Sequence, residues 1–209
     1  MTYSVKETYL TIQGEGAYTG RVAVFCRFAG CNLWSGLEED RATAVCRFCD
    51  TEFVGIDGPG GGKFDSPENL TRHILSFWDG TEDLFVVFTG GEPLLQMDNK
   101  LVEALKKEHV EIAIETNGTL IPPDGIDWIC VSPKQKADLM LQKGDELKIV
   151  YPQDGLDPSS FLDLDFDVFS LQPMDGPEYK DNLQQTMQYC RTHPEWRLSL
   201  QTHKYLQIP

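Results

Sequence analysis

Three cysteines near the start of the chain have a spacing that could hold a metal centre. They are Cys31, Cys46 and Cys49, arranged as Cys-x14-Cys-x2-Cys. Thiolates bind zinc and iron–sulfur clusters, and either kind of site ordinarily takes four protein ligands. The spacing alone leaves four interpretations open: part of a zinc site, a redox CxxC pair, a cluster held by three thiolates with one iron free to bind another molecule, and unrelated cysteines.

The sequence offers these three cysteines no evident fourth partner, because it contains no second CxxC and no HxxxH pair. Cys26 is a possible ligand, but it alternates with Val22, Val24 and Phe28, a pattern in which a core cysteine is expected. The four histidines are distant from the cysteines in sequence: His73, His109, His193 and His203.

Polar residues follow three apolar segments of strand length. Residues 84–88 lead into Thr89-Gly90-Gly91-Glu92-Pro93, residues 110–114 into Glu115-Thr116-Asn117-Gly118, and residues 128–131 into Ser132-Pro133-Lys134. Ligands gather at the carboxyl ends of parallel strands, where paired glycines admit a ligand close to the backbone and a carboxylate can accept from ribose hydroxyls. Each segment taken alone is equally compatible with a simple turn.

The apolar segments predict an α/β fold. Strands are expected at 21–28, 84–88, 110–114, 128–131, 146–150, 166–171 and 197–200, and most are apolar enough to be covered on both faces of a parallel sheet. Helices are expected after Ser66, from about Asp98, and over residues 180–192. Eight βα units typically take about 250 residues, so a partial barrel or an open curved sheet is predicted.

Composition and charge narrow the class of protein. The chain has 209 residues, of which 41% are hydrophobic and 24% charged, as in an ordinary globular domain. Its net charge of −15 opposes direct binding of nucleic acid or of an anionic membrane surface. The N-terminal residues predict no signal peptide, and cytoplasmic localisation is expected.

Taken together, the motifs resemble those of the radical S-adenosylmethionine superfamily and, within it, the 7-carboxy-7-deazaguanine synthase family. The resemblance rests on the cysteine set and TGGEP, with these further segments: QGEG (13–16), CRFAGCNLW (26–34), CRFCDTEF (46–53), GDELK (144–148), QPMDGP (172–177) and QTHKYL (201–206). It implies a single radical S-adenosylmethionine domain over 1–209, folded as a partial, helix-poor (β/α) barrel. The superfamily's usual motif is CxxxCxxC, so residues 32–45 form an insertion, either a short helix or an ordered loop.

The resemblance also implies a reaction. The family binds a [4Fe-4S] cluster through Cys31, Cys46 and Cys49, and S-adenosylmethionine chelates the remaining iron. A 5′-deoxyadenosyl radical then takes hydrogen from C6 of 6-carboxy-5,6,7,8-tetrahydropterin. The ring contracts, ammonia leaves and 7-carboxy-7-deazaguanine forms, as a step toward 7-deazapurines such as queuosine. The expected partners are a flavodoxin-like or other electron donor and a second copy of the chain.

The family's ligand contacts can be carried over to matching positions. Those for S-adenosylmethionine are Phe48, Cys49, Asp50, Gly91, Glu115, Asn117, Ser132, Pro133, Lys134, Gln172, Pro173, Met174 and Asp175. Those for the pterin are Ile12, Gln13, Gly14, Glu15, Arg27, Thr89, His203 and Pro209. Thr51 matches a magnesium-binding position.

Glu15, Arg27 and His203 are the expected catalytic residues. A guanidinium on the face that Arg27 shares with Ala23 and Phe25 needs an anion, which is the substrate carboxylate or an internal acid. Glu15 accepts from pterin N–H groups or is an exposed turn residue, and His203 handles a proton or lies on the surface. The apolar C-terminal residues 205–208 are expected to pack inward.

Two other classes of function compete. A radical activase would apply the same cluster chemistry to a protein substrate, but it would be expected to carry CxxxCxxC and a peptide groove. A zinc-stabilised binding module would carry out no catalysis. Turnover of the pterin separates the first from the synthase, and the metal content after anaerobic purification separates the second.

Overall fold

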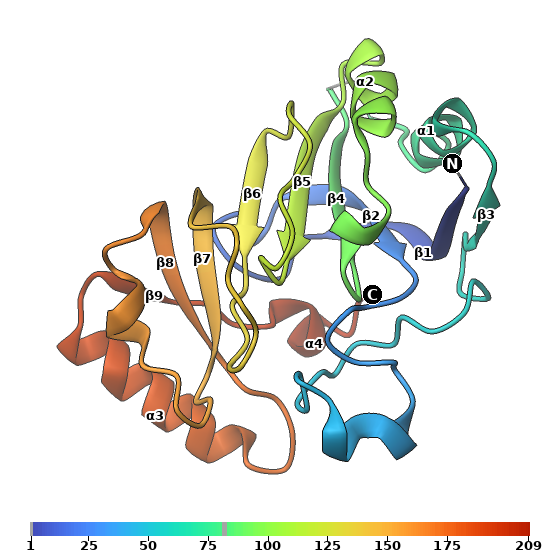
Figure 1. Ribbon diagram of the computed structural model, residues 1–209. Coiled ribbons are helices and arrows are strands. Elements are labelled where there is room, and N and C mark those ends of the chain that lie inside the picture. Colours follow the sequence, from blue (N-terminus) through green and yellow to red (C-terminus); the bar gives the residue numbers. More distant parts are fainter. Residues whose placement is uncertain (1, 81–82) are drawn as a thin grey trace.

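Nine β-strands form one curved, open sheet in the computed structural model, which describes residues 2–80 and 83–209 (Figure 1). Their order across the sheet is β3-β1-β2-β4-β5-β6-β7-β8-β9. The bounds are β1 Tyr3–Ile12, β2 Val22–Phe28, β3 Gly62–Phe64, β4 Phe85–Gly90, β5 Glu111–Thr116, β6 Trp128–Val131, β7 Lys143–Tyr151, β8 Asp165–Pro173 and β9 Trp196–Leu198.

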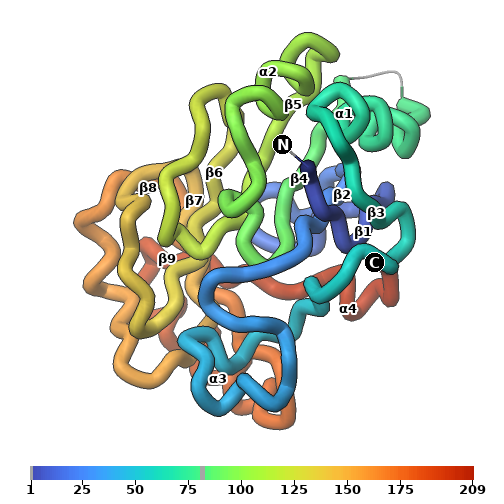
Figure 2. Tube along the Cα trace, turned by 45° about the vertical axis from the view of Figure 1, so that its right-hand side comes forward, coloured from blue at the N-terminus to red at the C-terminus, as the bar shows by residue number. Residues whose placement is uncertain are grey.

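Strand β2 and strands β4 to β9 are parallel, and β1 runs antiparallel between β2 and β3. The register aligns the ends of the strands: Arg27 of β2 pairs with Thr89 of β4, and Glu115 of β5 pairs with Cys130 of β6. The carboxyl ends of these parallel strands therefore meet along one edge of the sheet. The loop before β3 and the C-terminal helix lie on that side (Figures 1 and 2).

Helices are few in this fold. The α-helices are α1 Pro67–Leu75, α2 Asn99–Lys107, α3 Tyr179–Thr192 and α4 Thr202–Leu206, and the 3-10 turns are η1 Glu38–Thr43, η2 Pro93–Leu95 and η3 Pro158–Phe161. Two helices begin where the sequence predicted. The Ser66 side chain accepts from the Asn69 amide, as expected for an N-cap, and the Asp98 side chain accepts from the Leu101 amide in the same way. Within the described ranges, no helix is long and apolar enough to cross a membrane.

The hydrophobic core lies mainly between the sheet and its helices. Helices α1 and α2 cover β1, β2, β4 and β5 through side chains such as Leu70, Leu101 and Phe88, and α3 covers β7 to β9. On the opposite, concave face, Tyr18, Phe85 and Trp128 close the amino end of the sheet. Strands enclosed in this way explain the near-continuous apolar runs in the sequence.

The structure confirms the predicted fold class, an α/β sheet that is open and poor in helices, but some details of the chain differ from expectation. Strand β1 was not expected, because polar residues such as Lys6 and Thr8 interrupt its apolar pattern; both are nevertheless buried. The insertion at 32–45 agrees with one of its two expected forms, because it is an ordered loop that contains the η1 turn. The expectation that residues 205–208 pack inward is wrong for Tyr205 and Leu206, which are 60% and 59% exposed.

Candidate functional site

A cavity of about 510 Å³ lies at the carboxyl ends of the parallel strands. Its wall is built from the ends of β2, β4, β5, β7 and β8, from the loop after β1, from the cysteine loop and from the C-terminal segment. This volume falls within the range of small-molecule sites, which is about 300–1,000 Å³. The cavity therefore lies at the edge of the sheet where the sequence motifs predicted ligand binding.

The cavity collects nearly all of the residues selected from the sequence. Pro133 alone does not line it: this residue is buried behind the wall, and its carbonyl oxygen accepts from Gln153 Nε2 at 3.4 Å. The residues that do line it are Ile12, Gln13, Gly14, Glu15, Arg27, Cys31, Cys46, Phe48, Cys49, Asp50, Thr51, Thr89, Gly91, Glu115, Asn117, Ser132, Lys134, Gln172, Pro173, Met174, Asp175, His203 and Pro209.

The three clustered cysteines meet on one side of this cavity. Cys46 and Cys49 contact each other: the hydrogen bond between their thiols raises the pKa of Cys46 and lowers that of Cys49 to about 6. Burial raises the pKa of Cys31, whose sulfur also accepts from the Leu33 amide at 3.4 Å. Cys26 and Cys130 are buried in the sheet, and Cys190 is half-buried on α3.

This donor set suits an iron–sulfur cluster, because thiolates are its usual protein ligands. Over the residues that the structure describes, no three His, Cys, Asp or Glu side chains converge closely enough to hold one ion. A [4Fe-4S] cluster does not need its protein ligands to converge on one point, because each cysteine thiolate binds a different iron. Three thiols on a shared cavity wall can hold such a cluster and leave one iron facing the cavity.

The insertion holds the cysteine loop in shape. Arg41 Nη1 donates to the carbonyl oxygens of Arg47 and Cys49, at 2.9 and 3.1 Å. The guanidinium of Arg41 also stacks 4.0 Å from the Trp34 ring centroid and pairs with Glu38. The insertion before Cys46 thus satisfies two backbone carbonyl groups of the cysteine loop, one after the second cysteine and one at the third. No role for Arg41 or Trp34 was predicted from the sequence.

Glu92 of the TGGEP segment joins the ends of β4 and β5. Its carboxylate is fully buried and accepts from Thr116 Oγ1 and from the amides of Asn117 and Leu94, at 2.8, 2.8 and 2.9 Å. Burial raises the pKa of this carboxyl. A side chain at Gly91 would collide with the carbonyl oxygen of Gly30, so this close backbone approach requires glycine.

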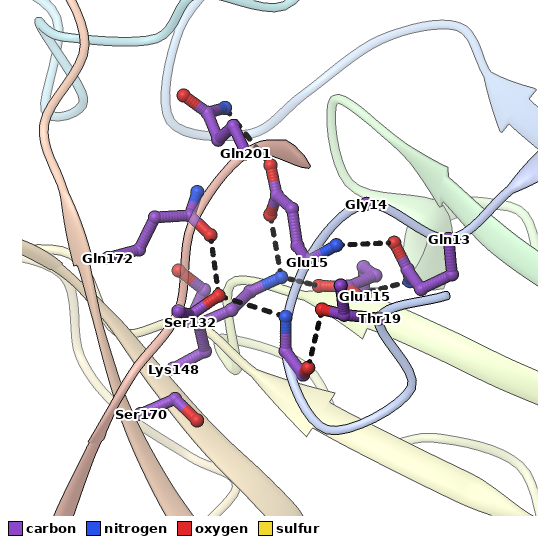
Figure 3. A network of polar contacts seen from close by, with 12 residues as sticks. Gln13, Gly14, Glu15, Thr19, Glu115, Ser132, Lys148, Ser170, Gln172 and Gln201 are labelled. Atoms are coloured by element: carbon purple, nitrogen blue, oxygen red, sulfur yellow. Dashed lines mark hydrogen bonds and ion pairs between the residues drawn. The ribbon is translucent and has the colours of Figure 1, made fainter. Parts of the chain in front are cut away.

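A buried lysine connects two of the predicted ligand contacts. Lys148 Nζ lies 2.8 Å from Glu15 Oε2 and 2.8 Å from Glu115 Oε2 (Figure 3). Burial alone would raise the pKa of Glu15, but the Lys148 ammonium and a hydrogen bond from Gln201 lower it to about 2. Glu15 is therefore a carboxylate at neutral pH. The GDELK segment stood out in the sequence, but no role for Lys148 could be predicted from it.

Arg27 and His203 line the part of the cavity between β1, β2 and the C-terminal segment. Arg27 Nε donates to Glu7 at 2.7 Å and Nη2 to the Tyr9 hydroxyl at 3.2 Å, so the internal acid considered from the sequence is present. The guanidinium nevertheless lines the cavity. Burial lowers the pKa of His203, which leaves its imidazole mainly neutral at pH 7, and the ring packs directly against Gly14.

The C-terminal segment closes the cavity from the other side. The Thr202 amide donates to the Gly14 carbonyl at 2.9 Å, and Thr11 Oγ1 donates to Pro209 O at 2.8 Å. Lys204 forms ion pairs with Asp50 at 2.7 Å and with Asp175 at 2.5 Å. These contacts place α4 between two segments that sequence analysis assigned to S-adenosylmethionine.

The class of protein follows from the sequence pattern of the Radical SAM superfamily, which matches residues 41–152. This span contains Cys46, Cys49 and the ends of β4, β5 and β6, and it begins after Cys31. The chain belongs to this superfamily.

The particular family follows from individual relatives. A 7-carboxy-7-deazaguanine synthase from Bordetella pertussis is 59% identical over 210 residues, and one from Bacteroides thetaiotaomicron is 36% identical over 208; both alignments cover 100% of each chain. QueE from Escherichia coli has a similar crystal structure, with a TM-score of 0.68, 26% identity and coverage of 96% of this chain and 94% of that one. This chain is a member of the 7-carboxy-7-deazaguanine synthase family.

The cysteine assignment predicts which substitutions remove iron. After anaerobic reconstitution, Cys31→Ala, Cys46→Ala or Cys49→Ala should each lose the cluster, whereas the wild-type chain should hold about four irons. Cys26→Ala, Cys130→Ala and Cys190→Ala are the matched controls. They should keep the iron, and each should lower the free energy of unfolding by about 0.5–3 kcal/mol. Loss of iron from a correctly folded control variant would show that the ligands are misassigned.

Proposed function

We propose that this protein is a 7-carboxy-7-deazaguanine synthase that converts 6-carboxy-5,6,7,8-tetrahydropterin to 7-carboxy-7-deazaguanine with loss of ammonia. The observation that carries the proposal is the cavity itself, where three thiols face a set of buried charges suited to a small polar anion. When bound, the reduced cluster and S-adenosylmethionine supply the radical that takes hydrogen from the pterin. The protein's own residues bind, orient and enclose the two organic molecules.

The S-adenosylmethionine side of the cavity runs along the strand ends. Glu115 offers carboxylate oxygens to ribose hydroxyls, and Asn117 is held by a bond from its Nδ2 to Asn32 at 2.9 Å. The Ser132 hydroxyl and carbonyl both accept from Lys134 Nζ, at 2.6 and 2.7 Å. Residues 172–175 and 48–50 complete this side, and Lys204 fastens them to α4.

The pterin side lies between β1, β2 and the C-terminal segment. Arg27 supplies a guanidinium for the substrate carboxylate, in a setting where Glu7 and Tyr9 fix its orientation. Glu15 offers a carboxylate to pterin N–H groups. The remaining edge of the pterin is surrounded by His203, Thr89, the backbone of residues 12–14 and the C-terminal residue Pro209.

Magnesium, an electron donor and a second subunit belong to the same proposal. Thr51 lies on the cavity wall two residues after Cys49, and magnesium often takes only one or two protein oxygens together with substrate oxygens. A flavodoxin-like protein is the proposed donor of electrons. A homodimer is supported by Leu10, Ile12 and Val22, apolar side chains that are 38–45% exposed at neighbouring positions of β1 and β2. We place the protein in the cytoplasm.

The direct test is turnover by anaerobically reconstituted protein with S-adenosylmethionine, a reductant and 6-carboxytetrahydropterin. The expected product is 7-carboxy-7-deazaguanine, with no net consumption of S-adenosylmethionine. Turnover of a protein substrate in place of the pterin would support a radical activase, and stoichiometric zinc without iron would support a binding module. Either result would overturn the proposal.

Thr51→Ala tests the magnesium site. The variant should need about 10–100-fold more magnesium for half-maximal rate, because it loses an oxygen that orients the ion, while its affinity for S-adenosylmethionine stays near the wild-type value. Thr51→Ser keeps the hydroxyl and serves as the matched control. The same magnesium dependence in all three proteins would remove Thr51 from the site.

A further inference from the structure

Lys148 is a buried cation at the end of the GDELK segment. None of the proposed ligand contacts gives this segment a role. The lysine lies on β7 between Leu147 and Ile149, which face the core behind the sheet, so strand alternation turns Lys148 to the concave face. Its side chain is only 4% exposed. A buried ammonium is costly unless it is paired, so the groups that surround it fix where it can lie.

The ammonium is shared between two carboxylates from distant parts of the chain. Glu15 comes from the loop after β1 and Glu115 from the end of β5, and each has an oxygen 2.8 Å from Lys148 Nζ (Figure 3). Burial alone would lower the pKa of Lys148, but these two carboxylates hold it well above its usual value. The lysine is therefore protonated whenever both acids are ionised.

A second side chain spans the same two acids. Gln13 Nε2 donates to Glu115 at 3.4 Å, and Gln13 Oε1 accepts from the Glu15 amide at 3.1 Å. Below them, the buried carboxylate of Glu146 accepts from Ser170 Oγ at 2.6 Å and from the Ala17 amide at 3.0 Å, which anchors the loop that carries Glu15. The position of Glu15 thus depends on groups that also hold Glu115.

We propose that Lys148 is a positioning residue that couples the two ligand sites, so that S-adenosylmethionine on Glu115 strengthens binding of the pterin on Glu15. The inference rests on the proposed function, which assigns these acids to different ligands. Ribose hydroxyls that order Glu115 also order the ammonium bound to it, and hence Glu15. The conformational entropy lost in ordering the shared ammonium is lost when the first ligand binds, so the second ligand does not lose it again. By linkage, the pterin strengthens binding of S-adenosylmethionine by the same factor.

The test is equilibrium binding by the cluster-loaded protein under anaerobic conditions without a reductant, so that no turnover occurs. Titration calorimetry gives the dissociation constant of 6-carboxytetrahydropterin with and without saturating S-adenosylmethionine. In the wild-type protein the ratio of the two constants should be about fivefold or more. In Lys148→Met, which has similar length but no charge, the ratio should fall to within about twofold of one.

Lys106→Met is the control, because it removes a lysine paired with Asp127 before β6, at the opposite end of the sheet. It should keep the wild-type ratio. If Lys148→Met loses iron or thermal stability, Lys148→Gln is used in its place. This variant retains hydrogen-bond donors without the charge, and its ratio of dissociation constants should likewise fall to within about twofold of one. A wild-type ratio in the folded Lys148 variant would overturn the inference. So would a ratio near one in wild-type protein that binds both ligands, whereas absence of pterin binding would instead contradict the proposed function.

Discussion

The cavity wall and the layer behind it hold charged side chains with little access to water, and the structure depends on satisfying each of them with an ion pair or hydrogen bonds. Glu92 has no exposed surface and is bonded to two backbone amides and one hydroxyl. Lys6 is 7% exposed and pairs with Glu52 and Asp57 in the segment after the cysteines. Because an unpaired buried charge is so costly, each of these pairs fixes one segment against another.

The same pairing explains why a site can be assembled from segments so distant in sequence. Parallel strands bring their carboxyl ends to one edge of the sheet, but they do not by themselves orient the loops that follow. Glu92 ties the end of β4 to that of β5, Lys148 ties β5 to the loop after β1, and Lys204 ties the C-terminal helix to the cysteine loop. The loops are thereby held over the cavity.

Sequence predicted the parts of the fold that local chemistry controls. The apolar runs correspond to buried strands, Ser66 and Asp98 cap the helices they were expected to start, and Cys26 is a core residue. Strand β1 was missed because its buried Lys6 and Thr8 look like surface residues until their neighbours are known. Exposure of Tyr205 and Leu206 was missed because apolar character does not say which face of a short helix is covered.

The candidate site was predictable where a motif carries its own chemistry, as in the cysteine set and TGGEP. It was not predictable where the role depends on long-range contact. Glu15 and Lys148 are separated by 133 positions, and no local pattern shows that one ammonium will lie between two acids. Arg41 is similar, since its importance comes from carbonyl groups that only the folded loop presents to it.

On this structure, the three clustered thiols of the cavity are expected to hold a cluster whose remaining iron binds S-adenosylmethionine. Mössbauer spectroscopy of the iron-57-reconstituted protein, before and after addition of S-adenosylmethionine, tests it most directly. The signal of about one iron site in four should change when S-adenosylmethionine is added, because Cys31, Cys46 and Cys49 are expected to bind the other three sites. A spectrum that S-adenosylmethionine leaves unchanged, in protein loaded with about four irons per chain, would contradict it.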